Sequence, residues 1–219
     1  MEYHWGTQMR RLFSGTLLIA LVISSLAFLS SALAQSSTLT WTTNVVDQSV
    51  NAESPSLAFD SIGNPHISYH DSTNGNLKYA KWNGYAWSIQ TVDGAKDVGQ
   101  YCSLALGSDD KPQITYLDSS NYNLKYARWT GTTWTISTID STGTQGGAYF
   151  EEGSLVVDFQ NKPHISYCSN DSLKYATWTG SSWDIQTVDS LTSGSSYFGC
   201  CSLALDSKGH PPHKQLQWF

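Results

Sequence analysis

The sequence is poor in positive charge, and the shortage is sharpest in arginine. Of its 219 residues, 12 are Lys or Arg against 18 Asp or Glu, which gives a formal net charge of −6 at pH 7. Beyond residue 34 the only arginine is Arg128. Proteins that bind nucleic acid or anionic lipid present a basic patch or stretch, and this sequence has no basic stretch. We therefore expect neither nucleic acid nor an anionic lipid surface as a partner.

Long hydrophobic runs are also scarce, and the one that exists lies near the start of the chain. Arg10 and Arg11 precede the largely apolar residues 12–29, and Ala32-Leu33-Ala34 has the small-x-small pattern that signal peptidase cuts after. We expect residues 1–34 to be a signal peptide, so that the protein is secreted or displayed at the cell surface. The alternative is an uncleaved anchor, because the run approaches the length that spans a bilayer. Membrane association is expected only through this segment.

Helical spacing is absent from the rest of the chain, which is built from repeats. Copies begin at Ser56, Ser103 and Ser154, and a fourth begins at Ser202. The repeat length of about 48 residues lies in the range of propeller blades. Each copy contains four short strand-like segments separated by turn residues such as Asn83-Gly84. The pattern predicts an all-β fold, a β-propeller of four-stranded antiparallel blades.

The repeats also set the expected boundaries. The propeller covers residues 35–211, and residues 212–219 form an aberrant tail. Within the propeller we expect a lone strand at 41–47, complete blades at about 48–93, 94–140 and 141–189, and a partial blade at 190–211.

Three complete blades are too few to close a ring, since propellers have about four to eight. Two hypotheses account for this shortage. Pro-Pro-His-Lys stands at 211–214 where the repeat predicts Pro-His-Ile-Ser, and the loss of one nucleotide from its codons would restore the expected residues, which suggests a frameshift. Alternatively, copies of the chain complete the ring as a homo-oligomer.

Tryptophans recur at equivalent places in all three complete copies. We interpret them as blade core rather than as ligand contacts, because every blade must fill the same wedge with large aromatic area. They are Trp82, Trp87, Trp129, Trp134, Trp178 and Trp183.

The least regular segments are the loops that join one blade to the next, and we expect ligand binding there. Aromatic rings beside carboxylates and amides suit sugars, whose C–H faces stack on rings and whose hydroxyls donate to carboxylates. The adjacent carboxylates at 151 and 152 would point to opposite faces of a strand, so we identify no catalytic residue. The candidate binding residues are Asp97, Gln100, Tyr101, Tyr149, Glu151, Glu152 and Tyr197.

The composition and these loops favour a non-catalytic binding module, with carbohydrate as the first choice of ligand and a surface protein as the second. The alternatives are a glycoside hydrolase or lyase of propeller type and a structural adhesion protein. No cofactor is expected. No metal site is expected either, because the histidines occupy blade positions rather than ligand spacing.

The four cysteines are expected to lie near one rim of the propeller. Cys102 and Cys201 precede the first strand of their copies, and Cys168 ends a second strand, which an antiparallel hairpin returns to the same rim. In an oxidising compartment a bridge from Cys168 to Cys200 or Cys201 is the expected disulfide.

The unit SLA-x-D-x-x-G-N-P-H-I-S-Y, followed by L-K-Y-A-x-W-x-G-x-x-W, resembles exported β-propeller repeats of the sialidase-like and fucose-lectin-like kind. The resemblance covers about residues 41–211. Sialidases hold the substrate carboxylate with a cluster of arginines, and a chain with Arg128 alone after the signal segment is not expected to have this activity. The fucose-lectin resemblance implies sites that use an arginine, a carboxylate and an aromatic ring, so a single arginine limits how far that specificity carries over.

Overall fold

The computed structural model describes residues 43–141, 153–169, 172–190 and 201–211. The expected signal peptide, the tail and the connector residues Tyr149, Glu151, Glu152 and Tyr197 lie outside these ranges. No helix in the described ranges is long and apolar enough to cross a membrane.

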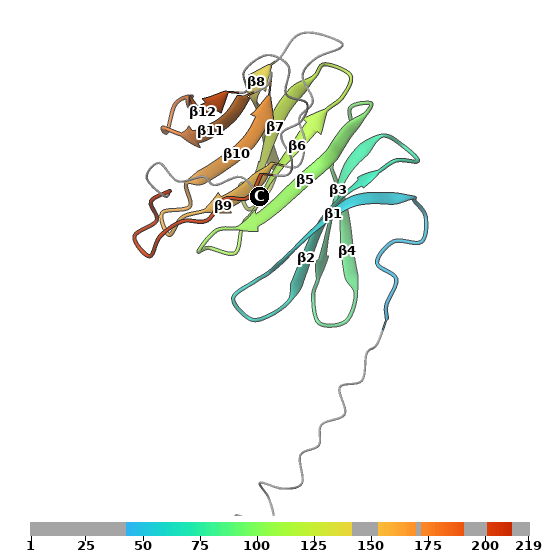
Figure 1. Ribbon diagram of the computed structural model, residues 1–219. Helices are drawn as coiled ribbons and strands as arrows, with labels where there is room; N and C mark the ends of the chain where they lie inside the picture. Colours follow the sequence, from blue (N-terminus) through green and yellow to red (C-terminus); the bar gives the residue numbers. More distant parts are fainter. Residues whose placement is uncertain (1–42, 142–152, 170–171, 191–200, 212–219) are drawn as a thin grey trace, which may run out of the picture. The chain divides into compact units, whose positions relative to one another are not determined.

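Three four-stranded antiparallel sheets form the described chain, each with its strands in sequence order (Figure 1). We refer to them as blades 1, 2 and 3, and they confirm the predicted all-β fold with propeller blades. Blade 1 contains β1 (Ala52–Phe59), β2 (Pro65–Asp71), β3 (Asn76–Trp82) and β4 (Trp87–Asp93). Blade 2 contains β5 (Val98–Leu106), β6 (Pro112–Asp118), β7 (Asn123–Trp129) and β8 (Trp134–Ser141). Blade 3 contains β9 (Ser154–Val157), β10 (Pro163–Ser169), β11 (Ser172–Trp178) and β12 (Trp183–Ser190).

The hairpin between the third and fourth strands has the same geometry in every blade. The tryptophans that flank it face each other across the ladder, as Trp82 faces Trp87, and glycines hold the turn with positive φ, 96° at Gly84 in blade 1. The two rings of this pair have their centroids 5.5 Å apart. Because glycine carries no Cβ, it adopts this backbone conformation without strain.

The first strands of blades 2 and 3 bury their apolar faces against the preceding blade. Leu104 of β5 joins a core cluster with Leu77 and Tyr79 of blade 1, and Leu155 of β9 packs in the same way on blade 2. The equivalent residue of β1 is Leu57, which is 56% exposed, whereas Leu104 and Leu155 are each 6% exposed. The core of the described chain therefore lies largely between blades.

The junction between blades 1 and 2 is also closed by a buried polar contact. Asp93, at the end of β4, accepts hydrogen bonds from the Tyr116 hydroxyl at 2.7 Å and from the Lys125 ammonium at 3.0 Å. Burial alone would raise the pKa of Asp93, but these two donors and the Ala95 N–H outweigh burial and hold the pKa below its usual value.

The same contact recurs at the next junction and before blade 1. Asp140 accepts from the Tyr167 hydroxyl at 3.0 Å and from Lys174 at 2.8 Å. Asp47 accepts from the Tyr69 hydroxyl at 2.8 Å, so it takes the place that Asp93 takes one blade later. The expected lone strand at 41–47 is nevertheless not formed by its described residues 43–47, which are not in a β-strand. A strand needs a ladder partner, and no described strand pairs with this segment.

Candidate functional site

The three described connector candidates lie where a blade connector meets the turn between the second and third strands. Gln100 and Tyr101 belong to β5 rather than to a loop, which corrects the expectation from sequence. The strand starts this early because shifts of register accommodate residues 99–102, with positive φ at Gly99 and Tyr101. Asp97 accepts a backbone hydrogen bond from Ser119 at 2.9 Å.

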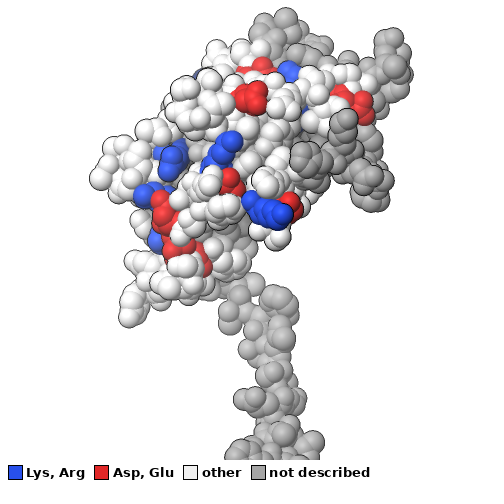
Figure 2. Space-filling view, turned by 90° about the vertical axis from the view of Figure 1, so that its left-hand side faces the viewer, with Lys and Arg blue, Asp and Glu red and all other residues white. Residues whose placement is uncertain are grey.

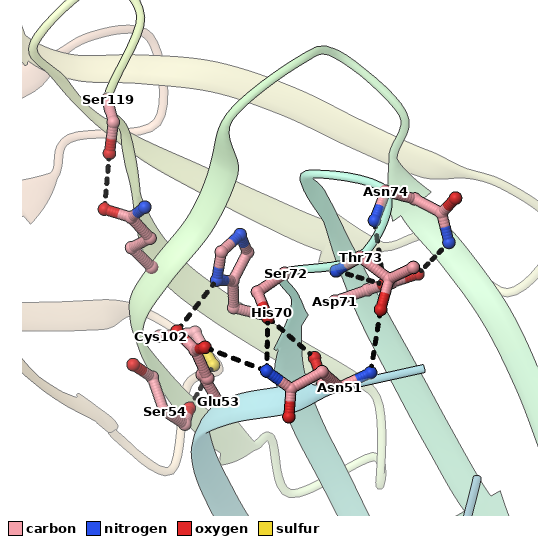
Figure 3. A network of polar contacts seen from close by, with 11 residues as sticks. Asn51, Glu53, Ser54, His70, Asp71, Ser72, Thr73, Asn74, Cys102 and Ser119 are labelled. Atoms are coloured by element: carbon pink, nitrogen blue, oxygen red, sulfur yellow. Dashed lines mark hydrogen bonds and ion pairs between the residues drawn. The ribbon is translucent and has the colours of Figure 1, made fainter. Parts of the chain in front are cut away.

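Polar side chains at this end of the blades are engaged mainly with one another (Figure 3). Gln100 accepts a 2.6 Å hydrogen bond from Ser119, and Asn51 donates to Glu53 at 3.2 Å and to Ser72 at 3.0 Å. Tyr101 is different, because its ring is 43% exposed. A ligand role for these connector residues stays a prediction.

The described cysteines occupy two blade junctions. Burial raises the pKa of the Cys102 thiol to about 11, and this thiol contacts the Ser68 hydroxyl at 3.2 Å, so it is not a reactive thiolate. The thiol also donates to the Ser54 carbonyl at 3.0 Å (Figure 3). At the junction between blade 3 and the start of the fourth copy, the Sγ atoms of Cys168 and Cys201 lie 2.7 Å apart. The expected disulfide partner Cys200 lies outside the described residues, and the bridge stays a prediction.

A recess lies at the opposite end of the strands, between blades 2 and 3. It is a groove of about 630 Å³, which we call the 2/3 groove. Blade 2 contributes residues of β7 and β8, and blade 3 contributes its two hairpin turns, at 160–163 and 178–183. These turns meet here because the first-to-second and third-to-fourth strand turns of a four-stranded antiparallel sheet share one end.

Aromatic rings form the wall between the two blades. Trp183 of blade 3 packs edge-on against Tyr126 of blade 2, with ring centroids 5.0 Å apart, and also contacts Trp178 at 5.3 Å. Its indole N–H donates to the Ser137 hydroxyl of blade 2 at 3.3 Å. Trp134 and Trp183 thus pack on core clusters, as expected from sequence for the repeated tryptophans, while Trp178 and Trp183 also line the groove.

The hydroxyl of Tyr126 is committed inside the protein. It donates a 2.6 Å hydrogen bond to the side-chain oxygen of Gln113, and burial raises its pKa. Tyr126 thus offers a ligand its ring rather than an ionisable group.

The turn at 158–162 is fixed against blade 2 by Asn161. Its side-chain oxygen accepts from the Ser108 N–H at 2.7 Å, and its carbonyl accepts from Gln113 at 3.3 Å. A Cβ on Gly107 would lie 2.4 Å from the Asn161 side-chain oxygen, so any other residue there would force the Asn161 side chain to shift. This contact holds one wall of the groove in place.

Polar side chains surround the aromatic wall. Arg128 projects from β7 on the same face as Tyr126, and the turn of blade 3 adds Gln160 and Lys162. Among the described residues, the lining contains no carboxylate and so no pair of acids of the kind that glycoside hydrolysis needs. The geometry suits binding by ring contact, hydrogen bonding and positive charge.

Sequence reasoning identified none of the polar residues of the groove. Arg128 was visible as the sole arginine beyond residue 34, at a repeat position that holds Lys81 in the first copy. The unusual residue at this repeat position could not show which turn of the next blade lies opposite Arg128.

Figure 2 shows basic and acidic side chains interspersed on the face that it displays.

No family model and no curated protein matches the sequence. The solved structures that resemble the fold include two lectins. A fucose lectin from Kordia zhangzhouensis in complex with methyl-fucoside is 19% identical with a TM-score of 0.41, and the match covers 60% of this chain and 96% of that chain. The SapL1 lectin in complex with alpha methyl fucoside is 17% identical with a TM-score of 0.44, and the match covers 60% of this chain and 45% of that one.

Proposed function

We propose that the protein is an exported, non-catalytic carbohydrate-binding module whose ligand occupies the 2/3 groove. The observation that carries this proposal is the aromatic wall of Trp178 and Trp183 beside the hydrogen-bonding side chains of Arg128 and Gln160. Sugars present C–H faces that pack on aromatic rings and hydroxyls that need polar partners. A mostly apolar recess with a few polar groups is the usual form of a small-molecule site.

The groove is held by contacts that do not involve a ligand. Trp183 is hydrogen-bonded to Ser137, and Asn161 is hydrogen-bonded to Ser108. The aromatic wall and the turn at 158–162 are therefore held in place without a ligand. Fixing a site in advance reduces the entropy lost when a ligand binds, which favours recognition of small saccharides. The alternative function, glycoside hydrolysis, uses a pair of carboxylates, and the described residues of this lining include none.

The test is glycan binding by residues 35–219, measured on a glycan array and then by titration calorimetry. We expect Thr135→Trp to abolish binding, because Thr135 lines the groove and a large ring would fill it. The matched control is Thr138→Trp, an exposed residue of the same strand that is not part of the lining. Thermal unfolding of both variants checks that they fold.

If Thr135→Trp still binds glycan, the ligand does not occupy the 2/3 groove. Failure to bind any glycan would overturn the carbohydrate proposal itself. Export has a separate test, since the secreted protein should begin near Gln35 by mass spectrometry if residues 1–34 are removed.

A further inference from the structure

The 2/3 groove has a counterpart between blades 1 and 2, which we call the 1/2 junction. Trp134 packs there on Tyr79 with ring centroids 5.3 Å apart and donates to Gln90 at 3.1 Å, as Trp183 does one blade later. The repeat therefore supplies an internal comparison, in which each residue of one junction has an equivalent in the other.

Cations at the 1/2 junction are neutralised by neighbouring carboxylates. Lys81, the equivalent of Arg128, lies 3.8 Å from the Asp60 carboxylate. Lys111, the equivalent of Lys162, forms a 2.8 Å ion pair with Asp109. A third carboxylate, Asp110, accepts hydrogen bonds from the backbone N–H and the hydroxyl of Ser61.

At the 2/3 groove all three carboxylates are replaced by uncharged residues while both cations remain. Gly107 stands for Asp60, Gln160 for Asp109 and Asn161 for Asp110. Among the described residues, neither Arg128 nor Lys162 has a carboxylate within ion-pair distance. The groove is thus a local centre of positive charge on a chain whose net charge is −6.

The nearest acidic residue of the same turn is already engaged. Asp158 accepts hydrogen bonds from the backbone N–H groups of Gln160 and Lys162, each at 2.8 Å, and lies 3.3 Å from His164. Its carboxylate is therefore held within blade 3 and forms no ion pair with Arg128.

We propose, building on the carbohydrate function above, that the 2/3 groove binds an acidic saccharide through the carboxylate of the sugar. The guanidinium of Arg128 is planar and presents paired donors that match a carboxylate, which the lysine at the 1/2 junction does not. Lys162 adds a second positive charge from the opposite wall, and Trp183 supplies a ring for the sugar face. A hydrogen bond to a charged group is strong enough to give an acidic sugar about tenfold or greater preference over its neutral counterpart.

The test compares matched sugars on residues 35–219 by titration calorimetry. The probes are methyl β-D-glucuronide against methyl β-D-glucoside, methyl α-D-galacturonide against methyl α-D-galactoside, and methyl α-N-acetylneuraminide against its methyl ester. We expect at least one acidic member to bind about tenfold or more tightly than its neutral partner, with an affinity that falls as salt rises.

Variants assign the preference to the groove. Arg128→Gln should remove the preference for the acidic sugar, Arg128→Lys should keep part of it, and Lys81→Gln at the 1/2 junction should leave it unchanged. Loss of the preference in Lys81→Gln but not in Arg128→Gln would overturn the assignment.

The two proposals fail in distinguishable ways. If neutral sugars bind as tightly as acidic ones, or if an array shows only neutral ligands, the acidic-sugar inference is overturned and the carbohydrate function stands. If no glycan binds, both are overturned.

Discussion

The hydroxyl of Tyr116 donates a 2.7 Å hydrogen bond to the carboxylate of Asp93, which belongs to the preceding blade. Both groups are buried, and Lys125 supplies the compensating charge at 3.0 Å. Equivalent contacts at Asp47 and Asp140 show that this bond is part of the repeat. The chain thus joins neighbouring blades with a buried, charge-assisted contact as well as with apolar packing.

We predict that Tyr116→Phe destabilises the chain by about 1.5–3 kcal/mol, the range for a hydrogen bond to a charged group. The ring is retained, so the change removes only the donor to Asp93. Urea unfolding followed by tryptophan fluorescence measures the effect. Tyr85→Phe is the control, because the side chain of Tyr85 is exposed and should change stability by less than about 0.5 kcal/mol. Equal effects of the two variants would contradict the role of this bond.

A pH dependence follows from the buried histidines of blades 1 and 3. Burial lowers the pKa of His66 and His164, because the imidazolium would lose its hydration. Below the ordinary pKa of 6.5 the unfolded chain binds these protons and the native chain does not, so stability falls as pH falls from 7 through 6.5 and below. Denaturant unfolding at a series of pH values between 7.5 and 5 measures this slope.

Blade 2 supplies the control for that prediction. Gln113 occupies the position that holds histidine in the other two blades. Its side-chain oxygen accepts a hydrogen bond from the hydroxyl of Tyr126, just as the His66 ring contacts the hydroxyl of Tyr79. The double variant His66→Gln and His164→Gln should therefore fold and should reduce the slope between pH 7 and 5. A slope equal to that of the unchanged chain would assign the pH dependence to other groups.

The 2.7 Å separation of the Cys168 and Cys201 Sγ atoms favours one of the two expected disulfide pairings. We predict that Cys168 pairs with Cys201 when the thiols are oxidised by a disulfide such as oxidised glutathione, which takes up the two electrons and two protons released. The loop between them spans 33 residues, for which chain entropy gives about 3–4 kcal/mol of stabilisation. Peptide mapping without reduction should find the bridge in Cys200→Ser but not in Cys201→Ser. A bridge retained in Cys201→Ser would show that Cys200 is the partner.

Self-association is the expected consequence of the apolar face of β1. Leu57 and Phe59 are 56% and 61% exposed, while Leu104, Leu155 and Leu203, the equivalents of Leu57, are each 6% exposed. Because the face is shaped for a blade of the same repeat, we predict that a second copy of the chain covers it. Light scattering on residues 35–219 should show a mass above that of the monomer, and Leu57→Asp with Phe59→Ser should lower it. A monomer at high concentration would contradict this prediction.

The sequence predicted the blades well because their determinants are local. Turn residues such as Asn83-Gly84 and the alternation around them lie within a few positions of each other, and repetition confirmed each interpretation three times. The 2/3 groove could not be predicted in the same way. Arg128 and Lys162 are 34 positions apart in the chain, and their proximity depends on how one blade stacks on the next.

The hydrogen-bond partners of the connector residues could not be predicted for a related reason. Asp97 and Gln100 have the residue types of a sugar site. In the fold, the Gln100 side-chain oxygen accepts from the Ser119 hydroxyl at 2.6 Å, and the Asp97 carboxylate contacts the Ser120 hydroxyl at 3.4 Å. Side-chain chemistry alone cannot distinguish a polar group that waits for a ligand from one that already has a partner in the fold. To predict these partners, one would need the register of β5 against β6. The register shifts at residues 99–102, and the sequence pattern does not reveal this shift.

Gly107 has a consequence for how such proteins can be recombined. Its missing Cβ makes room for the side chain of Asn161, which belongs to the following blade. A blade 2 rebuilt as a copy of blade 1 would carry aspartate at this position and would collide with a neighbour that had not changed. Residues that fit each other, such as Gly107 and Asn161, thus lie in adjacent repeats. A segment that is duplicated or exchanged must therefore contain both sides of a blade junction, and a single blade is not sufficient.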